Sequence, residues 1–560
     1  MDFLDLLSLN DRKLTVGIDF GTTFSGVAWA ETRRPDHISI IETWPSRLGT
    51  REGMSSPKVP TELRYTDDGT EWGFQISPTI DRHQWFKLGI AESRTLAGGG
   101  TPEELTTDYL TKLYEHIMYT LEQKIGPAVL RKVPLEFCLT VPAIWSESAK
   151  EKTLKACQKA GLRSNSEILL VSEPEAAAIC ALHGLDPHGL DIGDTFVLCD
   201  AGGGTVDLIS YTITALHPIL QVKEAAGGTG DLCGSTFLNR RFGDYLTRKL
   251  GGEAGWDNEI LAEAMDKFDT VIKKQYAPQI DGDDGYTILV PGLGNNPKLG
   301  ILRGRYTIKP ADMKAIFEPV IKKVIDLVNG QISASERKIR AVLLVGGFGQ
   351  NNYLKERLRA ALGELEVLQP PNAWTAVVRG AVMMGLSRAN PRLSSVSVMS
   401  RAARKHYGVE LHVSYESTIH NKSEMYWCER HEAYRVRAMH WLICKGDAVE
   451  ENKPHEITFR TGFPISEGKP KSATLTIWAD PSSLEAPVHN GPSVSKLVTL
   501  EADLTHLQKS DLDKTIQTYE DGLEYYVIAG SIEATFFSAS TKYVLRYQGK
   551  RYDTLKAEYV

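Results

Sequence analysis

Two segments of the chain carry alternating apolar and polar positions that lead into a glycine-containing turn. In KLTVGIDFGTTFSGVAWAE, residues 13–31, the alternation reaches Asp19 before a polar turn and a second apolar run. In VLCDAGGGTVDL, residues 197–208, an apolar run reaches Asp200, three glycines, a threonine and then Asp207. Each pattern predicts a β-hairpin. The two hairpins share the order of strand, aspartate, turn, threonine and strand, which indicates duplication of a whole lobe.

Apolar positions spaced three and four residues apart predict helices around these hairpins. Residues 146–162 are expected to form a helix with Ser146 as its N-cap and Gly161 as its stop. Residues 167–182 are expected to form a short strand, a turn at Pro174 and an alanine-rich helix. The other predicted segments are a helix at 101–126, a strand at 134–145, a strand, glycine turn and helix at 339–362, and a helix at 376–387.

The pattern changes after residue 390, where short alternating segments are separated by turns. A run of such strands without helices predicts an antiparallel sandwich. We therefore expect three domains, which are two α/β lobes at 12–196 and 197–390 and a β-rich domain at 391–560. The length of 560 residues agrees with this division, because it is too great for one ordinary core.

Composition narrows the classes of function. The formal net charge of -7 leaves no basic excess for nucleic-acid binding. No apolar run reaches the roughly 18 residues of a membrane span, so we expect no membrane insertion either. The N-terminal MDFLDLLSLN lacks the basic region of a secretory signal, and the 7 scattered cysteines form no C-x-x-C pair. These features predict a reducing, cytoplasmic location.

The two glycine turns predict a phosphate site. Glycines allow backbone N–H groups to approach an anion closely, and phosphate is the usual anion for such a turn. The neighbouring aspartates repel phosphate, but they can bind Mg²⁺, which itself contacts phosphate oxygens. The sequence therefore predicts a metal and phosphate clamp between two lobes. Its carboxylates are those of Asp19, Asp200 and Asp207, and its hydroxyl groups are those of Thr22, Thr23 and Thr205.

The motifs resemble those of the heat shock protein 70 family within the actin-like ATPase superfamily. IDFGTTFSGVAW is similar to the family's first phosphate motif, LCDAGGGTVDLI to its second, LLVSEPEAAAICAL to its connecting motif and VLLVGGFGQNNYL to its adenosine motif. These motifs stand in the family's order within residues 13–388, and WFKLGI, FDTVIKKQY and SRAARKHYGVELH look most like the divergent 12A-like branch. The resemblance implies two duplicated actin-like, ribonuclease H-like lobes that bind ATP with Mg²⁺, followed by the β-rich domain.

The resemblance also implies roles for individual residues. Lys87, Glu173 and Asp200 would form the catalytic set, with Lys87 near the γ-phosphate and the two carboxylates positioning metal and attacking water. From the residues alone, a solvated surface lysine is the alternative for Lys87. Metal binding would fall to Asp19, Asp200 and Asp207. The nucleotide-binding residues would be Asp19, Gly21, Thr22, Thr23, Gly202, Gly203, Gly204, Thr205, Lys273, Lys274, Gly346, Gly347 and Phe348.

The adenosine side departs from the family pattern. Thr270 stands at the family's glutamate position, and Gln350 stands where the family has an arginine that stacks on adenine. Trp374 replaces an acidic residue before the last helix of the second lobe. Two interpretations follow for the aromatic residues here. Either Phe348 or Trp374 stacks on the base, or both are core residues.

These features predict an ATP-binding protein with slow, Mg²⁺-dependent hydrolysis and a chaperone-like or partner-binding output. Its ligands would be ATP or ADP together with protein partners or client peptides. The alternatives are a pseudo-ATPase that uses nucleotide only as a switch, and a sugar or small-molecule kinase of the same superfamily. The β region is neither preceded by the family's linker nor followed by a helical pattern, so residues 391–560 are expected to act mainly as a docked structural and partner-binding module.

Overall fold

The computed structural model divides the chain into two compact units, Met1–Ser397 and Val398–Val560. The residues that it describes are 12–46, 55–77, 79–92, 100–162, 168–185, 190–277, 285–451, 453–505, 507–547, 550–552 and 555–559. The N-terminal segment MDFLDLLSLN lies outside these residues. The first unit contains both of the lobes expected from the sequence, and the domain limits at 196/197 and 390/391 stay predictions.

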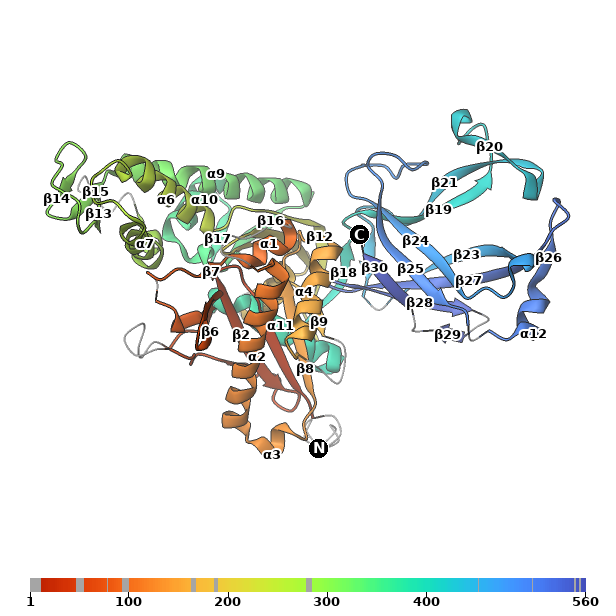
Figure 1. Ribbon diagram of the computed structural model, residues 1–560, viewed down its shortest axis with the longest axis horizontal. Coiled ribbons are helices and arrows are strands. Elements are labelled where there is room, and N and C mark those ends of the chain that lie inside the picture. Colours follow the sequence, from red (N-terminus) through yellow and green to blue (C-terminus); the bar gives the residue numbers. More distant parts are fainter. Residues whose placement is uncertain are drawn as a thin grey trace. The chain divides into compact units, whose positions relative to one another are not determined.

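The first sheet of unit 1 is built around the first hairpin (Figure 1). β1 (Leu14–Asp19) pairs antiparallel with β2 (Phe24–Glu31), which confirms that hairpin. The neighbouring strands complete the order β3-β2-β1-β8-β9, and β4 also pairs with β2. β1 and β8 pair in parallel, as do β8 and β9. The bounds of the added strands are Ser39–Ile40 for β3, Val59–Pro60 for β4, Leu135–Val141 for β8 and Leu169–Ser172 for β9.

The second sheet repeats this arrangement. β10 (Thr195–Ala201) pairs antiparallel with β11 (Val206–Ala215) and parallel with β16 (Ile339–Val345). β17 (Glu366–Leu368) and β12 (Leu220–Asp231) extend it to the order β17-β16-β10-β11-β12. This order matches β9-β8-β1-β2-β3 strand for strand, and corresponding pairs run in the same relative directions. The duplicated α/β architecture predicted from the sequence is therefore confirmed.

Two helices pack closely in unit 1, α5 (Glu173–Leu185) and α11 (Ala376–Ala389). A Cβ atom added to Gly380 would lie 1.7 Å from the carbonyl oxygen of Ala176, so only glycine permits this approach. Another side of α11 covers the first sheet, where Val382 belongs to a buried cluster with Ala28. The hydrophobic contacts of these two helices help to hold the hairpins in place.

Local sequence signals located most helices correctly. The segments predicted at 101–126 and 146–162 are α2 (Pro102–Ile125) and α4 (Glu147–Lys159). Ser146 caps α4 as predicted, because its side chain accepts a hydrogen bond from the backbone N–H of Ala149 at 3.2 Å. The turn predicted at Pro174 is wrong, since α5 already begins at Glu173. Proline is tolerated in a first helical turn, where its missing N–H would have no partner.

The remaining elements of unit 1 cover the sheets or form small additions. A large core joins the second sheet to α6, α7, α9 and α10. Among the described residues, none of the helices combines the length and apolar character needed to cross a membrane. The remaining bounds are α1 Phe86–Glu92, α3 Pro127–Leu130, α6 Thr236–Leu250, α7 Asn258–Lys267, α8 Lys273–Gln275, α9 Pro310–Ala334, α10 Asn352–Leu362, β5 Glu62–Thr66, β6 Gly69–Trp72, β7 His83–Gln84, β13 Tyr286–Leu289, β14 Ile301–Leu302 and β15 Arg305–Ile308.

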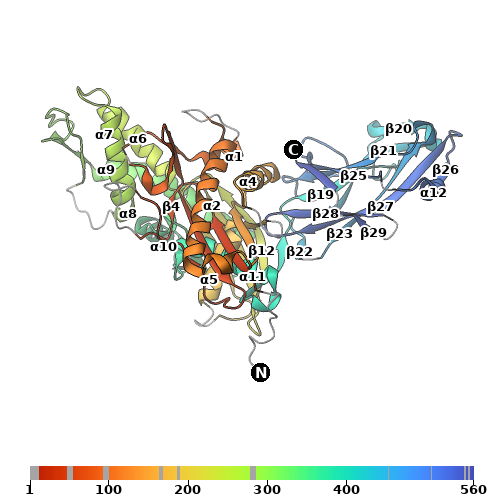
Figure 2. The same ribbon diagram turned by 60° about the horizontal axis from the view of Figure 1, so that its bottom comes forward.

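Unit 2 is an antiparallel sandwich, as predicted. One sheet has the order β20-β21-β19-β24-β25-β30, and the other has the order β23-β27-β28-β29, with β26 also paired to β27. Figure 2 shows the two sheets, with β19 and β25 in one and β23 and β28 in the other. Both sheets contribute to one core, in which Val498 of β25 and Ile532 of β27 are buried.

The apolar segment 524–537 lies almost entirely in one long strand, β27. This strand is paired on both edges and buried in the sandwich core. The bounds in this part are β18 Val396–Ala402, β19 His406–Ser414, β20 Met425–Cys428, β21 Ala433–Ile443, β22 Ala448–Glu450, β23 His455–Pro464, β24 Ser472–Asp480, β25 Ser495–Asp503, α12 Lys509–Leu512, β26 Ile516–Thr518, β27 Glu524–Phe536, β28 Thr541–Tyr547, β29 Lys550–Tyr552 and β30 Leu555–Tyr559.

Candidate functional site

One cleft in unit 1, with a volume of about 810 Å³, collects almost every residue singled out in the sequence. Asp207 is the exception, and it lies opposite Asp200 in the β10–β11 pair. The structure thus brings both hairpin turns and the later glycine turn into one site, while the roles of the residues stay predictions. The predicted residues that line the cleft are Asp19, Gly21, Thr22, Thr23, Lys87, Glu173, Asp200, Gly202, Gly203, Gly204, Thr205, Lys273, Lys274, Gly346, Gly347 and Phe348.

Backbone hydrogen bonds hold the second hairpin turn in a fixed shape. The N–H of Gly202 donates to the carbonyl of Thr205 at 3.0 Å. The carbonyls of Gly202, Gly203 and Gly204 accept from the N–H groups of residues 235, 236 and 234, at 3.1, 2.9 and 3.0 Å. Residues 234–236 lead directly into α6, so this helix start fixes the turn through its carbonyl side. A turn held in this way can present its N–H groups to an anion without rearranging.

The two hairpin turns also lie against each other. A Cβ atom at Gly203 would lie 2.3 Å from Oγ1 of Thr23, and one at Gly204 would lie 2.5 Å from Oγ1 of Thr22. Any larger residue would therefore push the turns apart. Glycine is required at both positions because the two turns approach each other so closely. The resulting cradle of backbone N–H and hydroxyl groups fits a phosphate group.

Four buried carboxylates lie at the acidic end of the cleft: Asp19, Glu173 and Asp200 line it, and Asp207 lies opposite Asp200 in the strand pair. Burial, followed by the charges of Glu173, Asp207 and Asp19, raises the pKa of Asp200 well above its ordinary value. Burial raises the pKa of Glu173 to about 7, although Lys87 acts in the opposite direction. Burial also raises the pKa of Asp207. These shifts express mutual repulsion and desolvation, both of which a bound cation would relieve.

Lys87, in α1, is a buried residue. Its Nζ lies 2.7 Å from Oε1 of Glu173, and only 2% of its side chain is exposed. The same Nζ lies 5.5 Å from the ring centre of Phe20 and 5.3 Å from that of Trp145. The alternative of a solvated surface lysine is therefore wrong. Lys87 lies at the acidic end of the cleft, beside the glycine turns. The negatively charged phosphates of a bound nucleotide would lie at this end.

The sequence analysis missed Lys58. Its Nζ lies 2.5 Å from Oδ2 of Asp19, and the two side chains are only 8% and 6% exposed. Lys58 also lines the cleft. In the sequence it is a single lysine between prolines, in SSPKVP, and no motif marks it. The pairing of β4 with β2 brings it beside the first hairpin, and this pairing is visible only in the tertiary structure.

The charges at this end fit a divalent cation. When all four carboxylates are ionised, they face two ammonium groups, those of Lys58 and Lys87, so negative charge is in excess. Within the described ranges, no three His, Cys, Asp or Glu side chains are arranged to hold a metal ion between them. Mg²⁺ usually takes water and phosphate oxygens together with one or two carboxylates, and the carboxylates that line this cleft could supply that share.

The opposite end of the cleft is lined by a helix with a π turn. α7 continues through the π-helical residues Phe268–Ile272 into α8. Lys273 pairs with Asp269, and its Nζ lies 3.0 Å from Oδ1 of Asn239. Lys273 and Asn239 lower the pKa of Asp269, although burial acts to raise it. Thr270, at the family's glutamate position, is exposed, so Asp269 is the acidic partner that holds Lys273.

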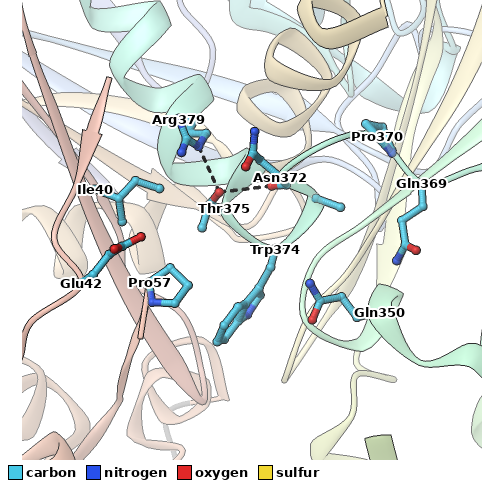
Figure 3. A pocket seen from close by; sticks show the side chains of 11 residues that line it. Ile40, Glu42, Pro57, Gln350, Gln369, Pro370, Asn372, Trp374, Thr375 and Arg379 are labelled. Carbon is cyan, nitrogen blue, oxygen red and sulfur yellow. Dashed lines mark hydrogen bonds between the residues drawn. The ribbon is translucent and has the colours of Figure 1, made fainter. Parts of the chain in front are cut away.

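A second pocket, of about 510 Å³, adjoins the cleft, and Trp374 and Gln350 line both spaces. Figure 3 shows the Trp374 indole extending into this pocket near Gln350, with Pro57 on the other side of the ring. Arg379 donates to Oγ1 of Thr375 at 3.1 Å at the back of the pocket. The lining is therefore mixed: polar side chains stand beside the indole, two proline rings, Ile40 and Ala373.

The structure separates the two aromatic candidates. Phe348 is only 3% exposed and belongs to the hydrophobic core of the second sheet, although it also reaches the cleft wall. Trp374 is half-buried, and its Nε1 would lie 3.3 Å from a Cβ atom at Gly347, so the indole lies against the glycine turn. Phe348 is thus a core residue, whereas Trp374 presents its ring to the pocket.

The fold and the cleft together define the class of protein. Two sheets of matching strand order, with their hairpin turns meeting in one cleft, form the architecture of actin-like ATPases. A sequence profile described as Hsp70 protein matches residues 64–408, and the chain belongs to this family.

Relatives of known name agree with this assignment. Heat shock 70 kDa protein 12B of Homo sapiens is 26% identical over 501 residues, covering 69% of this chain and 71% of that protein. Heat shock 70 kDa protein 12A of Homo sapiens is 24% identical over 497 residues, covering 69% and 72%. Chaperone protein DnaK of Deinococcus proteolyticus is 26% identical over 406 residues, covering 68% and 60%. The predicted resemblance to the 12A-like branch is confirmed.

Proposed function

We propose that the chain binds ATP with Mg²⁺ in this cleft and hydrolyses it slowly. The observation that supports this most strongly is the packing of the Gly202–Thr205 turn against Thr22 and Thr23, next to buried carboxylates. Membership of the Hsp70 family agrees with nucleotide binding at such a site. No specific feature of the cleft favours a kinase, which would need a second substrate beside the phosphate turns.

We assign the following roles in ATP binding and hydrolysis to residues of the chain. The N–H groups of Gly203 and Gly204 bind and orient the phosphates, and Lys87 adds a positive charge that Glu173 holds in place. Glu173 and Asp200 orient the attacking water, and Glu173 accepts its proton. Bound Mg²⁺ would neutralise phosphate charge and polarise the transferred group. Catalysis in this scheme is mostly positioning and electrostatic stabilisation.

Calorimetry of the purified chain tests the binding step. Titration with ATP, ADP and GTP, each with and without Mg²⁺, is expected to show saturable binding of ATP with Mg²⁺. Release of inorganic phosphate from ATP, measured in single turnover, tests hydrolysis. Absence of binding would contradict the proposal as a whole. Binding without any hydrolysis would leave a pseudo-ATPase that uses nucleotide as a switch.

At the other end of the nucleotide, we place the base against the indole of Trp374. Replacing Trp374 by alanine is expected to weaken ATP binding by about 5-fold to 150-fold, because stacking of a base on an aromatic ring contributes about 1–3 kcal/mol. Stacking reads no base edge, so ATP and GTP should lose affinity to a similar extent. Trp427→Ala provides the matched control, since Trp427 is 51% exposed on unit 2. Unchanged ATP affinity in Trp374→Ala would exclude this placement.

For unit 2, we propose binding of protein partners or client peptides. The family membership and the names of relatives such as chaperone protein DnaK support this. A fluorescein-labelled unfolded polypeptide, such as reduced carboxymethylated lactalbumin, provides a probe for fluorescence anisotropy with the full chain. Saturable binding is expected, and its absence would speak against a general client site.

A cytoplasmic location is also proposed, because all seven cysteines are free thiols.

A further inference from the structure

Lys58 has no role in the scheme above, yet it is one of two buried ammonium groups at the acidic end of the cleft. Lys87 pairs with Glu173 at 2.7 Å, and Lys58 pairs with Asp19 at 2.5 Å. Both lysines line the cleft. Lysine is rarely buried unless it is paired, and removal from water costs several kcal/mol per ion. A second buried ion pair in one cleft therefore calls for an explanation beyond stability.

The environment of Lys58 fixes the position of its ammonium group. The stem of the side chain packs on β2, where a Cβ atom at Gly26 would lie 3.2 Å from Cγ of Lys58. The hydroxyl of Ser56 donates to the carbonyl of Lys58 at 2.6 Å, and the carbonyl of Ser56 accepts from Nε1 of Trp44 at 2.7 Å. The segment is thus anchored at Ser56, before the lysine, and at β4, which begins with the next residue and pairs with β2. The charge is held at the first phosphate turn before any ligand arrives.

The location of this charge matters for an anionic ligand. Phosphate groups entering the cradle at Gly203 and Gly204 are repelled by the negative charge of four buried carboxylates, three of which line the cleft. Asp19 begins the turn that carries Thr22 and Thr23, the two residues that close this cradle. A fixed cation on Asp19 cancels one of the opposing charges, so less repulsion acts on the phosphates. This is part of the work that a divalent ion performs in a phosphate site.

We infer that Lys58 acts as a built-in cation at the phosphate end of the cleft, which allows nucleotide phosphates to bind even without a divalent metal ion. The inference rests on the proposed nucleotide binding and deepens it. Mg²⁺ would still be required for hydrolysis, because Lys58 provides charge at one fixed point and cannot bridge phosphate oxygens and water as a metal ion does. Binding and hydrolysis would then differ in their dependence on Mg²⁺.

The test compares ATP affinity with Mg²⁺ and in EDTA, by calorimetry, for the wild type, Lys58→Met and Lys58→Gln. In the wild type, removal of Mg²⁺ is expected to weaken binding by no more than about tenfold. In Lys58→Met the same removal should weaken it by about a hundredfold or more, while affinity with Mg²⁺ stays close to that of the wild type. Lys58→Gln keeps an N–H donor for Asp19 without the charge, so it covers the case in which the methionine variant does not fold. Lys58→Arg should restore metal-free binding.

Lys13→Met is the matched control, because Lys13 forms an ion pair with Glu136 while its side chain is 34% exposed. This variant should respond to EDTA like the wild type. A wild type that binds ATP with Mg²⁺ but not in EDTA would overturn the inference about Lys58 and leave the proposed function standing. Equal Mg²⁺ dependence in the wild type and the two neutral variants would also overturn it. A wild type that binds no ATP under any condition would remove both proposals.

Discussion

Replacing Gly203 by valine is expected to abolish detectable ATP binding while the chain stays folded. A Cβ atom at this position would lie 2.3 Å from Oγ1 and 2.8 Å from Cγ2 of Thr23, so the two turns must separate. The backbone N–H groups would then no longer converge on one phosphate group. Loss of a preorganised phosphate site with this geometry should cost about a hundredfold in affinity or more. Calorimetry with ATP and Mg²⁺ provides the measurement.

Gly252→Val serves as the control for this substitution. No other atom lies within 4 Å of a Cβ atom built at Gly252, so the same change there meets open space. Circular dichroism and thermal melting of Gly203→Val should remain close to those of the wild type, because the clash lies at the cleft and not in a sheet core. If Gly203→Val binds ATP like its parent, the Gly202–Thr205 turn is not the phosphate site.

The second large effect is expected at Glu173. Exchange of Glu173 for glutamine should reduce the rate of ATP hydrolysis by about 10²-fold to 10⁴-fold, the usual contribution of a positioned general base. ATP affinity should change much less, because the phosphates are bound by the glycine turn and by Lys87. The glutamine side chain has almost the same volume and can still accept a hydrogen bond from Lys87, which donates to Glu173 at 2.7 Å. Single-turnover phosphate release and calorimetry measure the two quantities separately.

Asp200→Asn should show the same separation of rate from affinity, since the Asp200 carboxylate lies in the same buried group. Glu136→Gln is a suitable control, because this carboxylate forms an ion pair with Lys13 and is absent from the lining of the cleft. Equal losses of rate and affinity in Glu173→Gln would instead indicate a structural role for the Lys87–Glu173 pair.

The sequence was most informative where a feature depends on a few consecutive residues. Ser146 caps a helix because its hydroxyl reaches an N–H group three residues away, and this can be anticipated from the local order of residues. Pro174 shows the limit of such signals. Proline fits both a turn and the first turn of a helix, and the choice depended on α5 starting one residue earlier.

Side-chain environments were harder to anticipate. From the sequence, Lys87 could be either a surface lysine or a buried one, because a short motif does not reveal which residues from other segments pack around its side chain. Both Phe348 and Trp374 could be either core residues or stacking rings, and only the tertiary structure distinguishes them: the core of the second sheet encloses Phe348, whereas Trp374 lines a pocket. The alternating apolar residues after position 523 indicate β structure, but only the pairing with β23 and β28 on its two edges sets the extent of β27.

By itself, the sequence determined the duplicated hairpins, the glycine turns with their flanking aspartates, and the family to which the chain belongs. These features are encoded in short stretches whose glycine, threonine and aspartate residues permit few other conformations. Only the tertiary structure decided that Lys58 pairs with Asp19, because strand pairing between β2 and β4 brings together residues 39 positions apart. The net charge of the cleft depends on this packing, since Lys58 and Asp19 lie in different segments of the chain. The expected dependence of ATP binding on Mg²⁺ follows from that net charge.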